Sequence, residues 1–431
     1  MHCFFPNLFS EMNQLEDNRK RKEYATSELV MAAVAMFLFK EGSRNAFNND
    51  RNHSEQFTSN FEKLFGCKLP HMDTVQPLFK ELKPLQLEEL KIKQVQQLIE
   101  KKVLHQFKLF DCFMVSVDAT GVISSDKDIF GCGLRKEYGE TISYQYHVLE
   151  AKLVTECGLC IPLASEWIIN EPGAQEVFDK QDCEQKAFKR LAAKLKKYFP
   201  RLPICLLADA LYANDPVMGI CEQYGWKYII TLQPGSLPGV QDCLKDDPRS
   251  AHNTFSWPVP SAQVNSSVSQ ELYWVEDLLH KKHVLHYLEC VETIRNHKTG
   301  KEQQAKFVRI TNLPTNKSTI KKLSRAARLR WKIENEGFNE QKNNGYAMEH
   351  LFCRKSFTAF QNYYQCLLIA HLINQLVENS CLVQLALQQH SKLTIKHLWK
   401  IIISTMQFGQ LCRDTITSIL QKRHQIRLYV Q

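Results

Sequence analysis

Two short apolar segments, each followed at once by an aspartate, constrain the fold of this 431-residue chain most strongly. The first is FMVSVD, which ends at Asp118, and the second is ICLLAD, which ends at Asp209. Segments of this length and composition are typical of buried strands. Open α/β sheets carry their chemistry at the carboxyl ends of strands, so we expect both acids at one edge of a sheet. Capping of a helix is the more common role of a lone aspartate, and it remains an alternative for each.

The segments around these strands predict a mixed α/β sheet with flanking helices. Residues 143–169 have the pattern of two strands joined by the turn ECGLC, and residues 180–199 have the periodicity of an amphipathic helix. Beyond the second acid, a short helix over 216–225 precedes another strand over 226–232. This alternation of strands and helices is typical of the α/β class.

The residue composition and the spacing of apolar residues change along the chain and predict five parts. Residues 1–105 form a helical N-terminal domain, for which DNA contact and plain packing remain alternatives. Residues 106–235 and 306–375 form the two parts of the sheet domain. Between them, residues 236–305 predict a β-rich insertion, and residues 376–431 predict a helical C-terminal region.

Bulk composition limits the class of protein. Hydrophobic residues make up 44% of the chain and charged residues 23%, which is ordinary for a globular protein with a core. The longest apolar runs, such as residues 30–39, have about half the length of a membrane span, so we expect buried helices and no membrane partner. The formal net charge of +9 favours a polyanionic partner.

The 15 cysteines favour a reduced, intracellular setting, because no signal-peptide pattern precedes them. One CxxC pair, Cys157 and Cys160, lies in the ECGLC segment. A structural zinc site needs four ligands, and no second pair follows at the spacing of a zinc finger. A turn between strands is therefore the favoured interpretation of this pair.

A third segment, RWKIENEGFNEQK, places a glutamate directly after a run of positive charge. Residues 317–332 carry seven basic side chains and no acid, and Glu334 follows them. On an α-helix, Arg330, Glu334 and Phe338 share one face, because successive residues are rotated by about 100°. A carboxylate beside an arginine stays ionised next to phosphate. The simpler alternative is a solvated helix with i,i+4 ion pairs.

The same helical geometry distinguishes Glu334 from its acidic neighbours. Glu336 and Glu340 lie about 200° and about 120° away from it around the helix, so neither replaces it on one face. Gln341 is expected on the face that carries Arg330 and Glu334.

Asp118, Asp209 and Glu334, in this order of elements, resemble the acids of the DDE transposases of bacterial insertion sequences. VSVDATG matches the strand of the first acid, and LLADALY matches the second motif, with Tyr212 three residues after its acid. LRWKIENEGFNEQK matches the third motif, with an arginine four residues before the glutamate. The similarity spans about residues 111–350, β-rich insertion included. It implies an RNase H-like catalytic domain of the cut-and-paste type.

The resemblance also implies metal-dependent chemistry on DNA. Asp118 would bridge two Mg²⁺ or Mn²⁺ ions, and Asp209 and Glu334 would hold one each. Hydrolysis at the transposon end would leave a 3′-hydroxyl, which would then attack target DNA. For Trp274, stacking on a flipped base and a buried core position are alternatives. The DNA-binding residues that the resemblance implies are Arg330, Lys332, Lys342, Tyr212 and Trp274.

Two positions depart from the family pattern. Ala327 stands where the family has a tyrosine, and Gln341 stands where it has a lysine, with Lys342 one residue further on. The contact with the phosphate at the transposon end is therefore expected to be built differently. The resemblance further implies a homodimer in the DNA complex and a location in the bacterial cytoplasm, at the nucleoid when the protein is bound to DNA.

Three other functions remain open on the sequence. A structure-selective nuclease of the same fold would cut DNA without joining it to a target. A transposase-derived DNA-binding protein would bind without cutting, although the complete set of three acids argues against this. An unrelated helical binding module would show no dependence on divalent metal.

Overall fold

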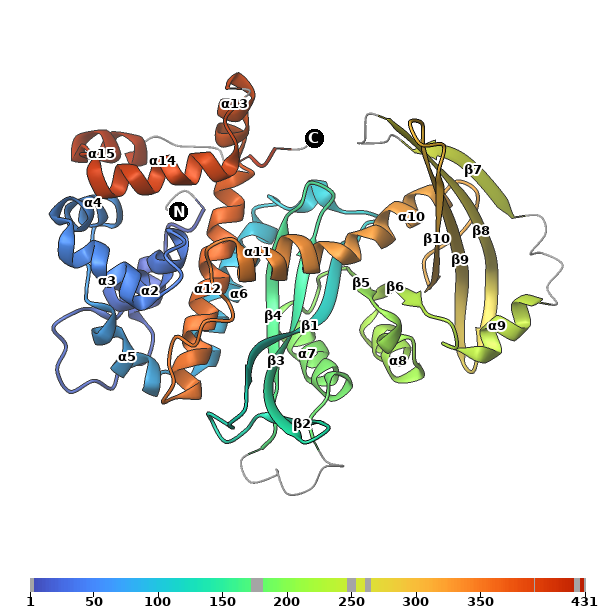
Figure 1. Cartoon of the computed structure of the whole chain (residues 1–431), viewed down its shortest axis with the longest axis horizontal. Helices are drawn as coiled ribbons and strands as arrows, with labels where there is room; N and C mark the ends of the chain where they lie inside the picture. Colours follow the sequence, from blue (N-terminus) through green and yellow to red (C-terminus); the bar gives the residue numbers. More distant parts are fainter. Residues whose placement is uncertain are drawn as a thin grey trace.

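The structure is a computed structural model, in which a helical region, a central sheet and a curved arm of long strands lie side by side (Figure 1). It describes residues 4–171, 181–245, 253–259, 265–390, 392–421 and 427–429.

Helices from both ends of the chain form the helical region (Figure 1). The N-terminal helices are α1 (Leu8–Asn13), α2 (Thr26–Leu38), α3 (Arg44–His53), α4 (Glu55–Phe65), α5 (Met72–Glu81), α6 (Pro84–Glu100) and the short η1 (His105–Phe107). The C-terminal helices are α12 (Phe357–Glu378), α13 (Cys381–Gln389), α14 (Ile395–Phe408) and α15 (Arg413–Gln421). The long α12 packs against α2, α5 and α6 and also against strand β4, so it joins the helical region to the sheet.

The apolar run over residues 30–39 forms most of α2, and its side chains are buried. The prediction of a buried helix is therefore confirmed. Among the residues that the structure describes, no helix is both long enough and apolar enough to cross a membrane.

In the part of the chain that the structure describes, ten strands form one mixed sheet that crosses the molecule. Its strands are β1 (Phe113–Ser125), β2 (Leu134–Tyr138), β3 (Thr141–Val154), β4 (Cys160–Ile168), β5 (Ile204–Ala208), β6 (Lys227–Leu232), β7 (Thr254–Val259), β8 (Ser266–His280), β9 (His283–Asn296) and β10 (Glu302–Thr311). Their order is β2-β3-β1-β5-β6-β10-β9-β8-β7, and β4 also pairs with β3. β1, β5 and β6 run parallel to one another, whereas β3 and β10 run antiparallel to their central neighbours.

Most strands and helices predicted around the two aspartates are confirmed. β3 and β4 form the predicted hairpin. Cys157 lies in the connection between them, whereas Cys160 is the first residue of β4. α7 (Glu184–Tyr198) and α8 (Asp215–Tyr224) are the predicted helices, and β6 is the strand that follows them. β2 was not predicted, because its residues are mostly exposed and lack an apolar pattern.

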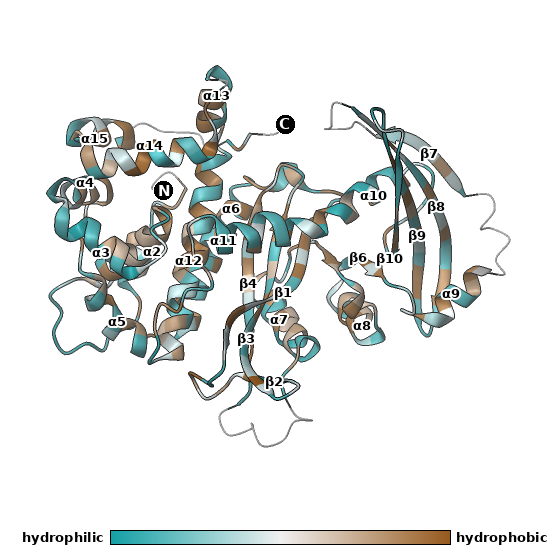
Figure 2. Cartoon of the chain, in the orientation of Figure 1, coloured by the Kyte–Doolittle hydropathy of each residue, from teal (hydrophilic) through white to brown (hydrophobic). Residues whose placement is uncertain are grey.

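The arm consists of β7 to β10, which continue the central sheet because β10 pairs with both β6 and β9. α9 (Pro238–Lys245) precedes the arm, and α10 (Ile320–Arg328) packs against β8 and β9. The buried side of α10 contributes apolar residues to a core shared with these strands, whereas hydrophilic residues cover its outer side (Figure 2).

The third segment is helical but irregular, so the prediction of a regular α-helix was wrong. After α10 come a 3₁₀ turn, η6 (Leu329–Trp331), then a π-helical stretch, η7 (Ile333–Asn339), and finally α11 (Glu340–Asn343). A π-helix has more residues per turn than an α-helix, so side chains that follow it are rotated from their expected directions.

Candidate active site

Asp118 and Asp209 lie where two parallel strands stop pairing. The ladder between β1 and β5 ends at Ser116 and Leu207, two residues before each acid. Asp118 continues within β1, and Asp209 stays extended with φ −83° and ψ −173°. The two acids thus occupy equivalent positions, two residues beyond the last pair of the ladder. The prediction that Asp118 ends its strand was wrong, because β1 runs on to Ser125, but the parallel ladder does end just before it.

Glu334 reaches this edge of the sheet through Arg330. Arg330 Nη1 lies 2.9 Å from Glu334 Oε1 and 3.6 Å from Asp118 Oδ2. The backbone here is attached to β1, because Ser116 Oγ donates a hydrogen bond to the Arg330 carbonyl oxygen at 3.0 Å. η6 also packs against β1 and β5, and η7 packs against β1. The structure thus brings Asp118, Arg330 and Glu334 together, and the i,i+4 ion pair expected from the simpler interpretation is part of this arrangement.

Burial and neighbouring charge perturb the carboxyl group of Asp118. Burial, and next the negative charge of Glu334, raise its pKa from 3.8 to about 7, whereas Arg330 acts to lower it. A carboxyl group with this pKa exchanges its proton near neutral pH, and a nearby cation stabilises its charged form. Two acids that repel each other in a partly buried site are therefore a favourable environment for added positive charge.

Asp209 is held by its own turn and by a buried tyrosine. Its Oδ1 accepts a hydrogen bond from the Leu211 backbone N–H at 2.9 Å and so caps η4 (Ala210–Tyr212). Tyr212 is fully buried, and its hydroxyl donates to Glu184 Oε1 at 2.6 Å. Burial raises the pKa of Glu184. Tyr212 therefore supports the turn after Asp209 from the interior, and its ring is not open to DNA.

The three predicted acids offer the oxygen ligands that Mg²⁺ and Mn²⁺ prefer. Among the described residues, however, no three Asp, Glu, His or Cys side chains converge closely enough to hold an ion. Asp209 points toward the Leu211 N–H, and Arg330 lies between the other two acids. The ligand chemistry thus fits a divalent ion, while Arg330 contacts both Asp118 and Glu334 in this arrangement.

The other predicted DNA-binding residues lie outside this group. Lys332 Nζ is 2.5 Å from Glu336 Oε1, and Lys342 Nζ is 2.8 Å from Glu349 Oε1. Trp274 on β8 is only 3% exposed and packs in the core beneath α10. Of the two alternatives for Trp274, the structure therefore has the core position.

Gln341 was expected beside Glu334, and this expectation was wrong. Gln341 is fully buried, where its Oε1 accepts a hydrogen bond from Lys152 Nζ at 3.0 Å. Its Nε2 lies 3.0 Å from His371 Nδ1. The residue follows the π-helical stretch, so its side chain points into the protein instead of along the face of Glu334.

The seven basic residues between positions 317 and 332 fall into two groups. Three show no carboxylate partner among the described residues: Lys317, Lys321 and Lys322. Four form ion pairs with acids: Arg325, Arg328, Arg330 and Lys332. The positive surface available to a polyanion is therefore smaller than the sequence suggests and is concentrated on α10.

Sequence reasoning missed three residues that support the acids. The role of Ser116 could have been predicted from the sequence, because it lies two residues before Asp118 and therefore on the same side of the strand. No sequence pattern indicated Glu184 or Lys152, since their contacts with Tyr212 and Gln341 arise only from tertiary packing.

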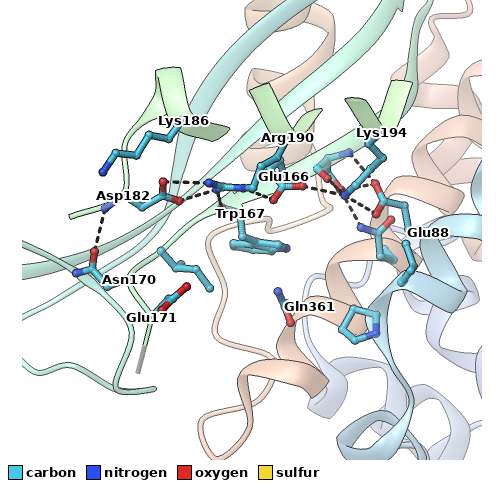
Figure 3. Close-up of a pocket in the computed structure, with 15 residues that line it drawn as sticks. Glu88, Glu166, Trp167, Asn170, Glu171, Asp182, Lys186, Arg190, Lys194 and Gln361 are labelled. Atoms are coloured by element: carbon cyan, nitrogen blue, oxygen red, sulfur yellow. Dashed lines mark hydrogen bonds and ion pairs between the residues drawn. The ribbon is translucent and has the colours of Figure 1, made fainter. Parts of the chain in front are cut away.

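A hollow of about 850 Å³ lies elsewhere, between α6, α7, α12 and β4 (Figure 3). Most of its charged side chains form ion pairs with one another. Arg190 pairs with Asp182 at 2.6 Å and with Glu166 at 2.7 Å, and Lys194 pairs with Glu166 and Glu88, both at 3.0 Å. None of the three predicted acids lines this hollow, so it is separate from the candidate active site.

Residues 171–373 match the family model of the transposase DDE domain. The matched range includes Asp209 and Glu334 and begins after Asp118. Together with the mixed sheet and its flanking helices, the match confirms the resemblance to DDE transposases and the RNase H-like fold class. A search of curated proteins finds no match to the chain.

Proposed function

Because this chain carries a DDE transposase domain, we propose that it is the transposase of a bacterial insertion sequence, which cuts DNA at the ends of its element and joins them to a target. The observation that supports this best is the meeting of the third segment with the first acid, where Arg330 contacts both Asp118 and Glu334. The strand register supports a place for Asp209 in the same site, because both acids follow the last paired residues of the β1–β5 ladder by two positions.

In the proposed reaction, Asp118, Asp209 and Glu334 would hold two Mg²⁺ or Mn²⁺ ions, and these ions would activate the attacking oxygen and stabilise the leaving oxygen. Asp118 must lose its proton to act as a ligand, and its raised pKa makes this loss dependent on pH near neutrality. Arg330 leaves the two acids and contacts a phosphate oxygen, for which its planar group of N–H donors is well suited.

We place the DNA on the outer side of α10 and η6. Lys321 Nζ lies 3.7 Å from the centre of the Trp257 ring, which holds this cation at the surface of the arm. Trp331 is 37% exposed and contacts Phe307 edge-on, with ring centres 5.7 Å apart. The Arg328 guanidinium lies 6.0 Å from the Trp331 ring. An exposed aromatic ring among cations suits an unpaired base, so we transfer to Trp331 the stacking role considered for Trp274.

Lys332 and Lys342 remain proposed phosphate contacts, since each would exchange one carboxylate partner, half-buried Glu336 or exposed Glu349, for a phosphate. We also propose a homodimer in the DNA complex, because an element has two ends that must be cut and joined together. The proposed location is the bacterial cytoplasm, at the nucleoid when DNA is bound.

The proposal is tested with purified protein and duplex DNA that carries the inverted repeats flanking its gene. Cleavage should require Mg²⁺ or Mn²⁺ and stop in EDTA. Asp118→Asn, Asp209→Asn and Glu334→Gln should each lower cleavage by several orders of magnitude and leave DNA binding nearly intact. The matched variants Glu336→Gln and Glu340→Gln should stay within about tenfold of the parent, or about 1.4 kcal/mol of barrier.

The outcomes separate the competing functions. Cleavage without joining to a target plasmid would identify a nuclease of the same fold. Tight binding without cleavage in either metal would identify a DNA-binding protein that no longer cuts. Undiminished cleavage in EDTA would refute the metal mechanism, and loss of activity in Glu340→Gln but not in Glu334→Gln would show that the third acid is wrongly assigned.

A further inference from the structure

We propose that Lys152, a fully buried lysine on β3, is a positioning residue that fixes Glu334 relative to the two aspartates. Its ammonium group lies 2.7 Å from Glu150 Oε2 and donates to Gln341 Oε1 at 3.0 Å. The structural part of this inference stands on these contacts, whereas its consequence for cleavage rests on the proposed function.

The sheet register shows why this lysine acts on the segment of Glu334. Ser116 on β1 pairs directly with Lys152 on β3, so both side chains leave the same side of the sheet. Ser116 Oγ binds the carbonyl oxygen of Arg330, four residues before Glu334. Lys152 binds Gln341, seven residues after it. One row of the sheet therefore holds the segment on both sides of the proposed third acid.

The packing around Lys152 adds to this two-point attachment. The Lys152 ammonium lies 4.5 Å from the centre of the Phe338 ring. A Cβ atom at Gly337 would lie only 3.1 Å from Lys152 Nζ and 3.1 Å from Cys160 Sγ, so this position of η7 is close to the sheet because it is glycine. The lysine thus contacts the end of the π-helical stretch and the first turn beyond it.

A role in positioning explains the buried charge better than a role in stability. Replacing a buried ion pair by apolar side chains is often neutral or stabilising, because desolvation of the two charges offsets their attraction. π-helical turns are rare and occur frequently at functional sites. A buried cation that contacts such a turn and its neighbours fixes its geometry, and Glu334 lies in that turn.

The same fold contains a matched control. Lys91 on α6 is also fully buried, and its Nζ lies 4.0 Å from Glu88 Oε1. Glu88 keeps a second partner, Lys194 at 3.0 Å, when Lys91 is replaced. Lys91 has no described hydrogen bond or ion pair with η7 or α11. Lys91→Met therefore removes a buried charge that acts on the Lys152–Glu150 pair at a distance, but it removes no contact with the segment of Glu334.

The experiment compares Lys152→Met and Lys91→Met in the full chain by hydrogen exchange, DNA binding and cleavage. In Lys152→Met, peptides covering residues 329–343 should exchange faster than in the parent, because the segment loses one attachment. Cleavage should fall about 100-fold, the usual effect of a misplaced catalytic group, with little change in DNA affinity. The Mg²⁺ concentration for half-maximal cleavage should rise. Lys91→Met should match the parent in all four measurements.

A second variant covers the case in which Lys152→Met folds poorly. Gln341→Met removes the acceptor but keeps the Lys152–Glu150 pair, and it should give the same changes. Unchanged exchange over residues 329–343 would overturn the attachment, and faster exchange with unchanged cleavage would overturn the positioning role. If the parent itself does not cut DNA, the proposed function fails, while the exchange data still decide the attachment.

Discussion

Replacing Asp118 by asparagine should stabilise the folded protein even as it removes the proposed cleavage. The pKa of Asp118 is raised from 3.8 to about 7, first by burial and then by the charge of Glu334. Folding therefore favours the protonated carboxyl group and disfavours the ionised one. Asparagine has nearly the same shape and carries no charge, so the variant folds without the free-energy cost of burying an ionised carboxyl group.

The sign and size of the effect follow from the two pKa values. Between pH 3.8 and 7 the folded protein binds more protons at Asp118 than the unfolded chain, so the free energy of unfolding falls as pH rises through this window. A shift of about three pKa units corresponds to at most about 4 kcal/mol at pH 8. The side chain retains 19% exposure, so we expect about 2 to 4 kcal/mol to be observed.

The assay is urea unfolding followed by intrinsic fluorescence at pH 8 and pH 5, in metal-free buffer. Asp118→Asn should be more stable than the parent at pH 8, and its advantage should fall by about half at pH 5. The control is Asp126→Asn, which replaces an exposed aspartate just after β1 and should leave the free energy of unfolding unchanged at both pH values. Glu334→Gln should reproduce part of the stabilisation seen in Asp118→Asn, because the charge of Glu334 is the second cause of the raised pKa of Asp118.

Two results would refute this reasoning. A variant Asp118→Asn that is no more stable than the parent at pH 8 would show that the carboxyl group is not penalised on folding. An equal gain at both pH values would show that the gain comes from packing or from a changed hydrogen bond, and not from the loss of a titrating charge.

Three further predictions concern metal, salt and glycine. Mg²⁺ should raise the melting temperature of the parent but not that of Asp118→Asn. At a Mg²⁺ concentration 100 times its dissociation constant, the parent should gain about 2.7 kcal/mol of stability. Equal changes in melting temperature for the two proteins would contradict a metal site at Asp118. DNA affinity should fall as the salt concentration rises. The double variant Lys321→Ala/Lys322→Ala should reduce the slope of log binding constant against log salt concentration by about 1.8, and an unchanged slope would show that α10 does not contact DNA. Gly337→Ala should destabilise the protein to urea by about 1 to 3 kcal/mol, because its Cβ meets a buried ammonium and a thiol. Gly219→Ala, in α8 with nothing within 4 Å, should instead stabilise it by about 0.5 to 1 kcal/mol, and equal effects would contradict the close approach at Gly337.

The strands around the two aspartates were predictable because local sequence dictates them. The segments before Asp118 and Asp209 are apolar and rich in strand formers, and the structure buries them at the centre of the sheet. Their parallel pairing and equal register then bring the two acids to one edge. The meeting of Arg330 with Glu334 was also predictable, since an i,i+4 pair depends on a single helical turn.

Burial of the aromatic candidates was not predictable from sequence. Tyr212 follows its acid at the spacing of the second motif, yet its hydroxyl is directed inward to Glu184. Trp274 lies on the side of β8 that also carries Leu272, and α10 covers this side. Trp331, by contrast, stays exposed because it lies in the short η6 turn beyond α10. The burial of Trp274 is thus decided by the placement of α10 over the arm, and that of Tyr212 by its contact with Glu184.

The irregular third segment explains why helical geometry succeeded for one residue and failed for another. Glu334 lies near the beginning of η7, so its relation to Arg330 is still that of one ordinary turn. Gln341 follows η7, and one extra residue in a turn rotates everything beyond it by about 100°. That rotation directs Gln341 inward to Lys152, while Glu334 stays on the outer side with 49% of its side chain exposed. The departure from the family pattern at Gln341 and the buried lysine beneath it are therefore two parts of one arrangement, because an amide can accept a hydrogen bond from that ammonium and a second lysine could not.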